Sequence, residues 1–412
     1  MNKGITQLLA RKDKVLHEGR LGLLCNQVAF DQESGAYLHE VLAQRGNLAR
    51  VFVPEHGLFA ELQDQVPLPD AGIYQQQDSL DNPVEFVSLY GGTPESLRVQ
   101  QDKIQDLDAL IVALQDVGSR YYTFAITLSY LLDHLAETGN QLQVYIIDYE
   151  NPAGRWVEGT RLPAAFTSFI GREGMIHRHG MTLGELCGFW QARSGGRYGL
   201  QVIPLDQPAV ARLNADQPQM PIPPSPNMPL IETTRVYGGQ CLLEGTNISE
   251  GRGTTRPFEI FGAPWFDRLQ KAGKDHYAIR TRGVVMRPLQ FLPAFHKYAN
   301  ETCHGYQIHQ TGEGFHSLAV SLQLIAGIAE RCAGDFHFLK GPYELMSRRP
   351  AIELMAGDSL ILDYLKGQAT FSSVCEALSE AQSEWITTMQ PYLIYDTPFR
   401  QIPPAQNLLS WE

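Results

Sequence analysis

The stretch Asp108-Ala-Leu-Ile-Val-Ala-Leu114 decides the fold class of this chain, because its six consecutive apolar residues predict a strand buried on both faces. Similar apolar runs occur at residues 21–26, 49–53 and 143–147, with helical patterns between them at residues 34–46 and 121–138. Buried strands that alternate with helices predict a parallel sheet covered by helices on both sides. We therefore expect a Rossmann-like, doubly wound α/β domain with a mainly parallel sheet.

A proline-rich segment divides the chain. Six prolines fall from Pro218 to Pro229, which excludes a regular helix or a central strand there. Beyond it the pattern is α+β, with strands expected near residues 283–287 and 304–310 and helices near residues 316–331 and 373–390. We expect a Rossmann-like domain over residues 1–230 and a smaller α+β domain over residues 231–412. A further irregular stretch, residues 63–86, is either the lid or wall of a site or a solvated insertion.

The composition argues against several classes of protein. The 412 residues carry a net charge of −12, whereas binding to nucleic acid backbones requires clustered Lys and Arg. The six cysteines are scattered without a Cys-x-x-Cys pair, so we expect small buried side chains and no zinc site. No apolar stretch is long enough to span a bilayer, and no signal-peptide run opens the sequence. We expect no membrane insertion and a cytoplasmic protein, or a periplasmic or secreted one if a leader has been removed.

The sequence gives no sign of a cofactor. The first predicted strand leads into Cys25-Asn-Gln-Val-Ala-Phe30, which has none of the glycines of a dinucleotide-binding loop. A phosphate-binding Gly-x-x-x-x-Gly-Lys loop, a Gly-x-Ser-x-Gly elbow and a His-Glu-x-x-His motif are also absent. His177 and His179, together with the nearby acids, lack the spacing of metal ligands. We expect neither a cofactor nor a metal.

Three acids follow predicted parallel strands directly: Glu55, Asp116 and Asp148. Ligands of open α/β sheets bind outside the carboxyl ends of the strands, so this pattern gathers carboxylates where a site belongs. The motif Pro54-Glu-His-Gly57 is the most compact, because proline and glycine fix the backbone around two groups that transfer protons. Glu55 is therefore the leading candidate for a catalytic acid, and we expect His56 and Asp148 to bind the substrate.

Further polar side chains gather in short motifs after the strands and beyond the proline-rich segment. We expect substrate-binding side chains from these motifs at Arg120, Tyr121, Tyr122, Asn151, His179, Asn227, Glu244, Asn247, Glu250 and Arg252. One of the two adjacent tyrosines is expected to be a core residue. Thr182 and Glu185 have the spacing of a capping box, which favours a structural role for Glu185.

The motifs together resemble the exo-β-N-acetylmuramidases of the NamZ type. The resemblance rests on Pro54-Glu-His-Gly57, Ser88-Leu-Tyr-Gly91, Gln115-Asp-Val-Gly-Ser-Arg-Tyr-Tyr-Thr123, Asn151-Pro152, His179-Gly-Met-Thr182, Ser225-Pro-Asn-Met-Pro229, Glu244-Gly-Thr-Asn247, Ser249-Glu-Gly-Arg-Gly-Thr254, Pro257-Phe-Glu259 and Gly262-Ala-Pro-Trp265. It implies a site in the cleft between the two domains. It also implies release of N-acetylmuramic acid from the non-reducing end of peptidoglycan fragments, where that sugar is β-1,4-linked to N-acetylglucosamine.

The resemblance also implies roles for individual residues. The acid of the Pro-Glu-His-Gly motif is the family's proposed catalytic residue, which carries over to Glu55. Muramic acid bears a lactyl carboxylate, so its pocket should hold a cation, and Arg120 and Arg252 are the candidates. Glycoside hydrolysis usually requires a second carboxyl group, for which Asp116 is the first choice, as nucleophile, base or orienting group.

Several alternatives stay open. Glu244, Glu250 and Asp148 are other candidates for the second carboxyl group, and the 2-acetamido group of the substrate is a further route. The chain reads Asp148-Tyr-Glu-Asn-Pro152 where the family has Asp-Arg-Pro-Asn-Pro, so the length or exact preference of the substrate is expected to differ. A metal-assisted peptidoglycan hydrolase or amidase and a non-catalytic muropeptide-binding protein are the competing functions.

Overall fold

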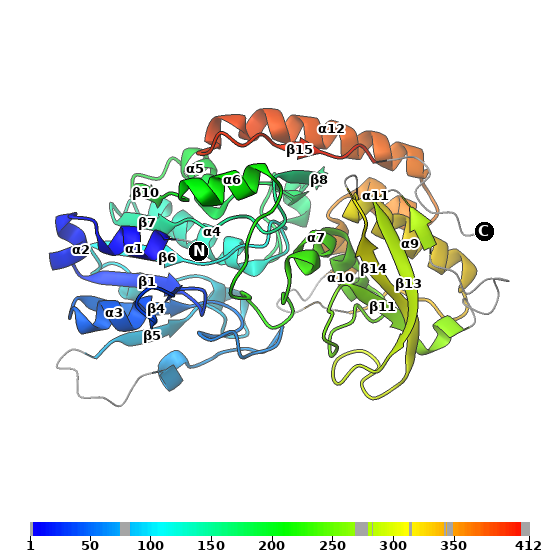
Figure 1. Ribbon diagram of the computed structural model, residues 1–412, viewed down its shortest axis with the longest axis horizontal. Helices are drawn as coiled ribbons and strands as arrows, with labels where there is room; N and C mark the ends of the chain where they lie inside the picture. The colour runs from blue at the N-terminus through cyan, green and yellow to red at the C-terminus, as the bar shows by residue number, and fades with distance from the viewer. Residues whose placement is uncertain are drawn as a thin grey trace.

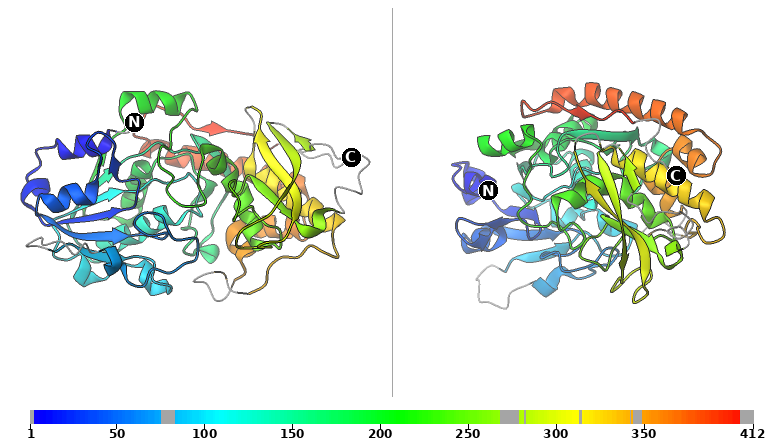
Figure 2. Two further views of the ribbon diagram at one scale, coloured as in Figure 1. Left: turned by 60° about the horizontal axis from the view of Figure 1, so that its bottom comes forward. Right: turned by 45° about the vertical axis from the view of Figure 1, so that its right-hand side comes forward.

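The computed structural model describes residues 3–74, 83–267, 279–281, 283–312, 315–341, 343 and 349–404. Two domains lie side by side along the long axis of the molecule (Figures 1 and 2). The first domain contains a six-stranded parallel sheet in the order β10-β7-β6-β1-β4-β5. Its strands are β1 (Leu21–Cys25), β4 (Leu48–Val53), β5 (Glu85–Ser88), β6 (Ala109–Ala113), β7 (Gln143–Ile147) and β10 (Gly199–Ile203).

This strand order is that of a doubly wound sheet. Numbered along the chain and starting at the β5 edge, the strands run 3-2-1-4-5-6, and the winding reverses between β1 and β6. In such sheets the ligand crevice lies outside the carboxyl ends of the strands. The loops that follow β4 and β6 therefore occupy the edge at which a site is expected.

Helices cover both faces of the sheet because alternate side chains of each strand enter different cores. Leu23 of β1 packs on one side with the first three helices, and Leu24 packs on the other with the next two. These helices are α1 (Gly4–Leu9), α2 (Lys14–Glu18), α3 (Leu38–Gln44), α4 (Thr123–Glu137) and α5 (Leu183–Ser194), and α6 (Gln207–Asn214) follows β10. Burial on both faces explains why the strands consist of continuous apolar runs.

The second domain contains an antiparallel sheet of four strands in the order β11-β14-β13-β12. The strands are β11 (Ile260–Ala263), β12 (Ile279–Thr281), β13 (Val284–Phe291) and β14 (Cys303–Gln310). The helices are α7 (Ile231–Gln240), α9 (Ser317–Arg331), α10 (Ala351–Ala356), α11 (Ser359–Leu365) and α12 (Phe371–Met389). Helices α7 and α9 approach closely at Gly239, where a Cβ atom would lie 2.1 Å from the carbonyl oxygen of Ser317.

The end of the chain returns to the first domain. Helix α12 runs along β8 (Trp156–Arg161), and β15 (Arg400–Gln401) pairs in parallel with the same strand (Figure 1). The indole of Trp385 is fully buried and donates a hydrogen bond to the carbonyl oxygen of His179 at 2.9 Å. One continuous apolar core therefore extends from the first domain into the second.

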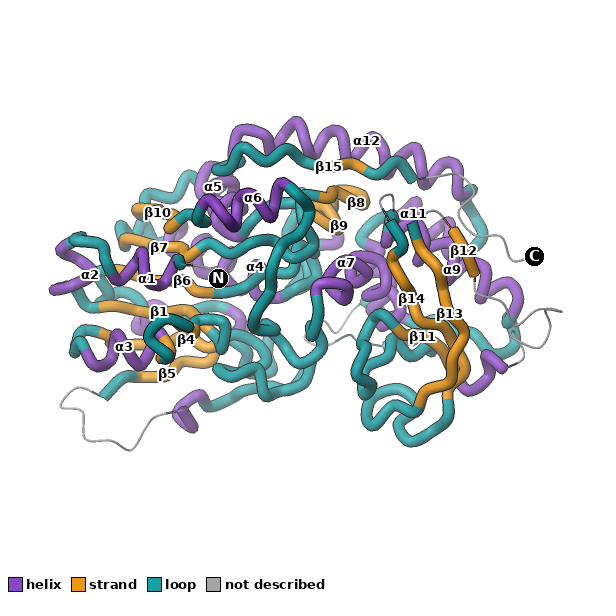
Figure 3. Tube along the Cα trace, viewed as in Figure 1, coloured by secondary structure: helices purple, strands orange, loops and turns teal. Residues whose placement is uncertain are grey.

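Short elements complete the fold. They are β2 (Phe30–Asp31), β3 (Ala36–Tyr37), β9 (Ile176–Arg178) and the 3₁₀ turns Ala71–Tyr74, Pro94–Leu97, Gln101–Lys103, Ala164–Phe166, Cys241–Gly245, Pro264–Phe266 and Gln390–Tyr392. The proline-rich segment is loop throughout, as its prolines predict (Figure 3). No helix among the described residues is long and apolar enough to cross a bilayer.

The predicted fold class is confirmed, with two strands added. The sequence patterns did not reveal β5 and β10, which are the edge strands and only partly buried. The predicted helix at residues 34–46 is shorter, since α3 begins only at Leu38. Of the predicted irregular stretch, residues 75–82 lie outside the described residues. All six cysteines are free and buried, as expected.

Candidate functional site

A pocket lies where the carboxyl edge of the parallel sheet meets the second domain. The first domain and the proline-rich segment contribute Glu55, His56, Asp64, Tyr121, Tyr122, Thr123, Ile170, Ser225, Asn227 and Met228. The second domain contributes Tyr237, Cys241, Glu244, Arg252, Phe258, Tyr343 and Met355. The position between the domains is the one that the sequence resemblance implies.

Glu55 is the best-positioned acid of the pocket. It follows β4 and is 4% exposed, and its Oε2 accepts a hydrogen bond from the Thr123 hydroxyl at 2.7 Å. Thr123 is the first residue of α4, so the start of this helix positions the carboxylate. On the other side, the main-chain N–H of Gln65 donates to Oε1 at 3.3 Å. Both oxygens of this buried carboxylate are thus oriented.

The Pro-Glu-His-Gly motif forms a tight turn that brings the following loop back over Glu55. His56 and Gly57 both have a positive φ, at 72° and 85°. The φ of Gly57 lies in the region that favours glycine, and a Cβ atom there would also lie 2.6 Å from the Tyr74 hydroxyl and 2.7 Å from the Glu61 carboxylate. His56 is fixed by a hydrogen bond between Nδ1 and the carbonyl oxygen of Leu62 at 3.0 Å. This turn explains why Gln65 reaches Glu55.

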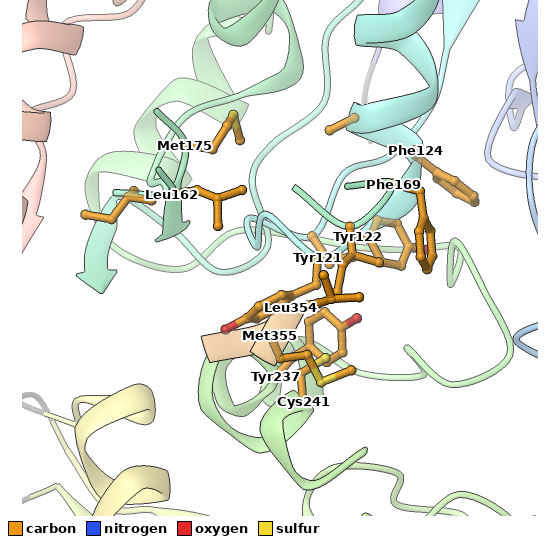
Figure 4. Packing of buried hydrophobic residues seen from close by; sticks show 14 of the residues in the cluster. Tyr121, Tyr122, Phe124, Leu162, Phe169, Met175, Tyr237, Cys241, Leu354 and Met355 are labelled. Carbon is orange, nitrogen blue, oxygen red and sulfur yellow. The ribbon is translucent and has the colours of Figure 1, made fainter. Parts of the chain in front are cut away.

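Tyr121, Tyr122 and Tyr237 are among the residues that line the pocket. Figure 4 shows these side chains gathered in one buried cluster. The rings of Tyr121 and Tyr122 both lie perpendicular to that of Tyr237, with centroid distances of 6.0 and 6.5 Å. Burial raises the pKa of Tyr122 well above its usual value, and the negative charges of Asp116 and Glu55 raise it further. This hydroxyl therefore stays protonated and remains a hydrogen-bond donor at neutral pH.

Arg252 is the cation of the pocket, and three carboxylates surround it. Its guanidinium lies 2.7 Å from Glu244, 3.1 Å from Glu250 and 3.1 Å from Asp64. The guanidinium also packs over the ring of Phe258, 4.8 Å from its centroid. Burial alone would lower the pKa of Arg252, but the surrounding carboxylates raise it well above its usual value. The arginine is therefore charged and rigidly held.

Glu250 lies behind Arg252 instead of in the pocket lining. It accepts a hydrogen bond from Lys297 at 2.9 Å and contacts His296 at 3.1 Å. The positive charge of Lys297, together with His296 and Arg252, outweighs burial and lowers the pKa of Glu250 well below its usual value. Glu250 is ion-paired with Arg252, and its expected contact with substrate stays a prediction.

Asp116 is buried one layer behind the pocket lining. Its Oδ2 accepts from the Gly118 main chain at 2.6 Å and lies 3.1 Å from Nε2 of His179. Because Nδ1 of His179 accepts from the Met181 main chain, Nε2 carries the proton and donates to Asp116. Neither side chain lines the pocket. The catalytic role expected of Asp116 and the substrate contact expected of His179 therefore stay predictions.

The side chains of Asp148 and Asn151 are hydrogen-bonded to other residues of the protein. Asp148 is fully buried and accepts hydrogen bonds from the Thr182 and Tyr395 hydroxyls, both at 2.7 Å. Asn151 bridges the main chains of Met181 and Ala153. The predicted capping box of Thr182 and Glu185 is present at the start of α5. Asp148 and Asn151 organise the approach to this helix and do not line the pocket.

Arg120 and Asn247 also differ from their expected roles. Arg120 is 1% exposed, and its guanidinium donates to the carbonyl oxygens of Ile170 and Leu354 at 3.3 and 3.2 Å. Asn247 bonds to the main chains of Asp335 and His337. Both side chains are hydrogen-bonded to main-chain groups. Of the two predicted cations, Arg252 lines the pocket and Arg120 does not.

Several pocket residues were missed by the sequence motifs. Asp64 comes from the irregular stretch that was interpreted as either a lid or wall or a solvated insertion, and Thr123 was noted only as the end of a motif. Tyr237 and Tyr343 come from the second domain, where no motif marked them. The hydroxyl of Tyr343 donates to Glu244. Asn227 lines the pocket as expected, with its amide donating to Gln63 at 2.9 Å.

A second, roomier hollow lies at the switch point of the sheet. Its lining includes Val28 after β1, Gln115 after β6, and the adjacent Tyr149 and Glu150 after β7. Tyr149 and Glu150 are the residues at which the chain departs from the motif it resembles. Glu150 is held by Arg212. We place the candidate site in the pocket between the domains because that pocket is lined by both Glu55 and the buried cation Arg252.

The described residues contain no group of three or more His, Cys, Asp or Glu side chains arranged to hold a metal ion. The fold and the pocket define a two-domain α/β protein whose candidate site, lined by three carboxylates, tyrosines and one arginine, lies between the domains. The arginine is the group in this lining that can pair with a carboxylate of a ligand.

Comparison with known proteins identifies the family. The N-terminal model of the exo-β-N-acetylmuramidase NamZ matches residues 21–232, and the C-terminal model matches residues 235–395. The peptidoglycan β-N-acetylmuramidase NamZ of Bacillus subtilis (strain 168) is 30% identical over 399 residues, which cover 95% of this chain and 91% of that protein. The chain belongs to the NamZ exo-β-N-acetylmuramidase family.

Two crystal structures of DUF1343 family proteins from Bacteroides fragilis NCTC 9343 have the same fold. One has a TM-score of 0.75 at 21% identity and the other a TM-score of 0.69 at 25% identity. Each alignment covers 95% of this chain and 98% of the other. The two-domain architecture is therefore shared along almost the whole chain.

Proposed function

We propose that this protein is an exo-acting glycoside hydrolase that releases N-acetylmuramic acid from the non-reducing ends of peptidoglycan fragments by cleaving its β-1,4 bond to N-acetylglucosamine. Membership of the NamZ family supports the reaction. One structural observation carries the proposal: Glu55 is oriented by Thr123 in the same pocket as the buried cation Arg252. An acid and a cation in one pocket match a substrate with a scissile glycosidic oxygen and a carboxylate.

Glu55 is the general acid and base in this proposal. Its carboxyl group donates a proton to the leaving oxygen of N-acetylglucosamine while the bond to the anomeric carbon breaks. The resulting carboxylate then takes a proton from the water that attacks the anomeric carbon. The hydrogen bonds from Thr123 and from the main chain of Gln65 hold the carboxyl group in one orientation through both steps.

The nucleophile is proposed to be the 2-acetamido group of the substrate. Besides Glu55, the acids that line the pocket are Asp64 and Glu244, and both are ion-paired with Arg252. Asp116, the first choice from the sequence, lies behind the lining. The acetamido oxygen would attack the anomeric carbon and form an oxazoline-type ring, which water then opens. The protonated Tyr122 hydroxyl is a suitable donor for orienting this group.

The lactyl carboxylate is proposed to bind Arg252. A guanidinium pairs with a carboxylate through two parallel hydrogen bonds, which gives both strength and orientation. Within the described pocket lining, Arg252 is the sole arginine or lysine. Selectivity for muramic acid over glucosamine would then follow from this contact, because the two sugars differ by the lactyl group.

The decisive experiment compares 4-nitrophenyl β-glycosides of N-acetylmuramic acid and N-acetylglucosamine. Wild type is expected to release nitrophenol from the muramic substrate alone, and Glu55→Gln to lose more than about a thousandfold in kcat. Thermal unfolding of both proteins controls for folding. Equal hydrolysis by Glu55→Gln would overturn the role of Glu55. Binding of muropeptides without any product from wild type would indicate a non-catalytic protein instead.

A further inference from the structure

The three carboxylates around Arg252 come from different parts of the chain. Glu244 and Glu250 belong to the second domain, within a few residues of the arginine itself. Asp64 belongs to the first domain, in the loop that follows the Pro-Glu-His-Gly turn. The ion pair of Asp64 and Arg252 therefore joins the two domains across the pocket, and both side chains line it.

The three carboxylates are not held equally. Glu250 has Lys297 and His296 as further partners. Glu244 accepts a hydrogen bond from the Tyr343 hydroxyl and a weak one from the Cys241 thiol. The other described contact of the Asp64 carboxylate is a long hydrogen bond of 3.4 Å from the amide of its exposed neighbour Gln65. Asp64 is thus the carboxylate that leaves most easily.

The contact between Asp64 and Arg252 is close but poorly aligned. Oδ1 of Asp64 lies 3.1 Å from Nε of Arg252. Nevertheless, among the described residues no acceptor is placed to complete a hydrogen bond with that buried N–H group. The side chain of Arg252 is only 7% exposed, so this N–H group is largely shielded from solvent. A better-aligned carboxylate would gain a charge-assisted hydrogen bond there.

The charges around Arg252 allow a ligand carboxylate to bind in exchange for Asp64. Three carboxylates already surround one guanidinium, and Lys297 and His296 compensate only Glu250 directly. A fourth carboxylate beside Asp64 would be repelled at short range with little solvent to screen it. A ligand carboxylate therefore binds Arg252 only if Asp64 moves away.

We propose that Asp64 takes the place of the substrate carboxylate. Asp64 pairs with Arg252 when no substrate is bound, and the lactyl group of the substrate displaces it. The inference rests on the proposed function, because that function supplies the displacing carboxylate. It assigns Asp64 a part in substrate selection: a sugar without a carboxylate cannot displace it. Since the main chain of the next residue, Gln65, holds Glu55, displacement of Asp64 also reaches the catalytic acid.

The test measures binding of N-acetylmuramic acid and of N-acetylglucosamine by calorimetry to wild type, Asp64→Asn and Asp64→Ser. Both substitutions remove the competing charge. The second variant keeps the test valid if the first one misfolds. We expect N-acetylmuramic acid to bind about tenfold more tightly to the variants, and N-acetylglucosamine to bind equally to all three proteins. With the chromogenic muramide, KM should fall while kcat changes much less.

Asp70→Asn is the matched control, since Asp70 lies in the same loop, is exposed and bonds to the main chain of Gly72. It should behave like wild type. Unchanged or weaker binding of N-acetylmuramic acid by both Asp64 variants would overturn the inference, as would a loss of kcat as large as that of Glu55→Gln. If wild type shows no preference for N-acetylmuramic acid, the proposed function itself fails, so the two failures are distinguishable.

Discussion

The hydroxyl of Thr123, the first residue of α4, lies 2.7 Å from Oε2 of Glu55 and donates a hydrogen bond to it. Glu55 follows β4 and Thr123 begins the helix after β6. These two strands flank β1 in the sheet, and the two residues are 68 positions apart in sequence. The contact orients the acid from the first residue of a helix.

Thr123→Val should therefore reduce turnover without unfolding the protein. Valine keeps the shape of the side chain but removes the donor, so the carboxyl group of Glu55 gains rotational freedom. We expect kcat for the chromogenic muramide to fall about 10- to 100-fold, with a much smaller change in KM. Thr138→Val, at the exposed C-terminal end of the same helix, is the control. Equal kcat values for both variants would contradict a positioning role for Thr123.

The variant Asp116→Asn tests whether Asp116 is a buried structural acid or the nucleophile. The asparagine oxygen can still accept the hydrogen bond that Asp116 receives from His179 or from the main chain of Gly118. We expect kcat to fall no more than about tenfold, whereas removal of a reacting group costs more than about a thousandfold. Steady-state kinetics beside Glu55→Gln decides the matter. A loss as large as that of Glu55→Gln would restore Asp116 as the nucleophile.

The variant Arg120→Lys tests whether Arg120 stabilises the fold, in contrast to Arg252, which is proposed to bind the substrate. Arg120 donates to carbonyl oxygens of both domains, and burial lowers its pKa, so its replacement should affect folding more than binding. We expect a loss of about 2–4 kcal/mol in the free energy of unfolding, because lysine leaves buried carbonyls unsatisfied. KM for the muramide should stay within about twofold of wild type. Urea unfolding and kinetics on the same samples check both values, and a raised KM at unchanged stability would contradict them.

The sequence was sufficient to predict the central strands and the location of Glu55. Strands buried on both faces are continuous apolar runs, and the rule that places ligands after such strands requires no knowledge of distant contacts. The edge strands β5 and β10 lack that signature, because they are only partly buried. The pattern therefore revealed the centre of the sheet and not its edges.

The rest of the site depends on contacts between distant segments. Arg120 and Arg252 occur in equally polar motifs, and only the packed structure shows that Arg120 is enclosed by main-chain carbonyls while Arg252 faces the pocket. Asp64 and Tyr343 reach the pocket through the return of a loop and the approach of the second domain. No local spacing encodes such approaches, so these residues could not be predicted.

The stability of the protein should report the ionisation of Asp148. Burial raises the pKa of Asp148 to about 6 from its usual value of 3.8, so the folded state favours the protonated form. The stabilisation is fully present below about pH 4 and is lost as the pH rises through about 6. Relative to Asp148→Asn, wild type should lose up to about 3 kcal/mol over this interval. Urea unfolding at several pH values measures the difference, which should be constant above about pH 7; a difference independent of pH throughout would contradict it.

The stereochemistry of the product tests the proposed role of the acetamido group. Attack by the 2-acetamido oxygen followed by attack of water inverts the anomeric carbon twice, so the β-configuration is retained. NMR spectra taken before mutarotation should show β-N-acetylmuramic acid as the first product. A covalent enzyme intermediate would also give retention, so a second measurement is required. Replacing the acetamido group by trifluoroacetamido weakens the internal nucleophile and should lower kcat strongly, whereas attack by an enzyme carboxylate would leave kcat nearly unchanged. The α-anomer as first product would instead require direct attack by water and would exclude assistance by the acetamido group.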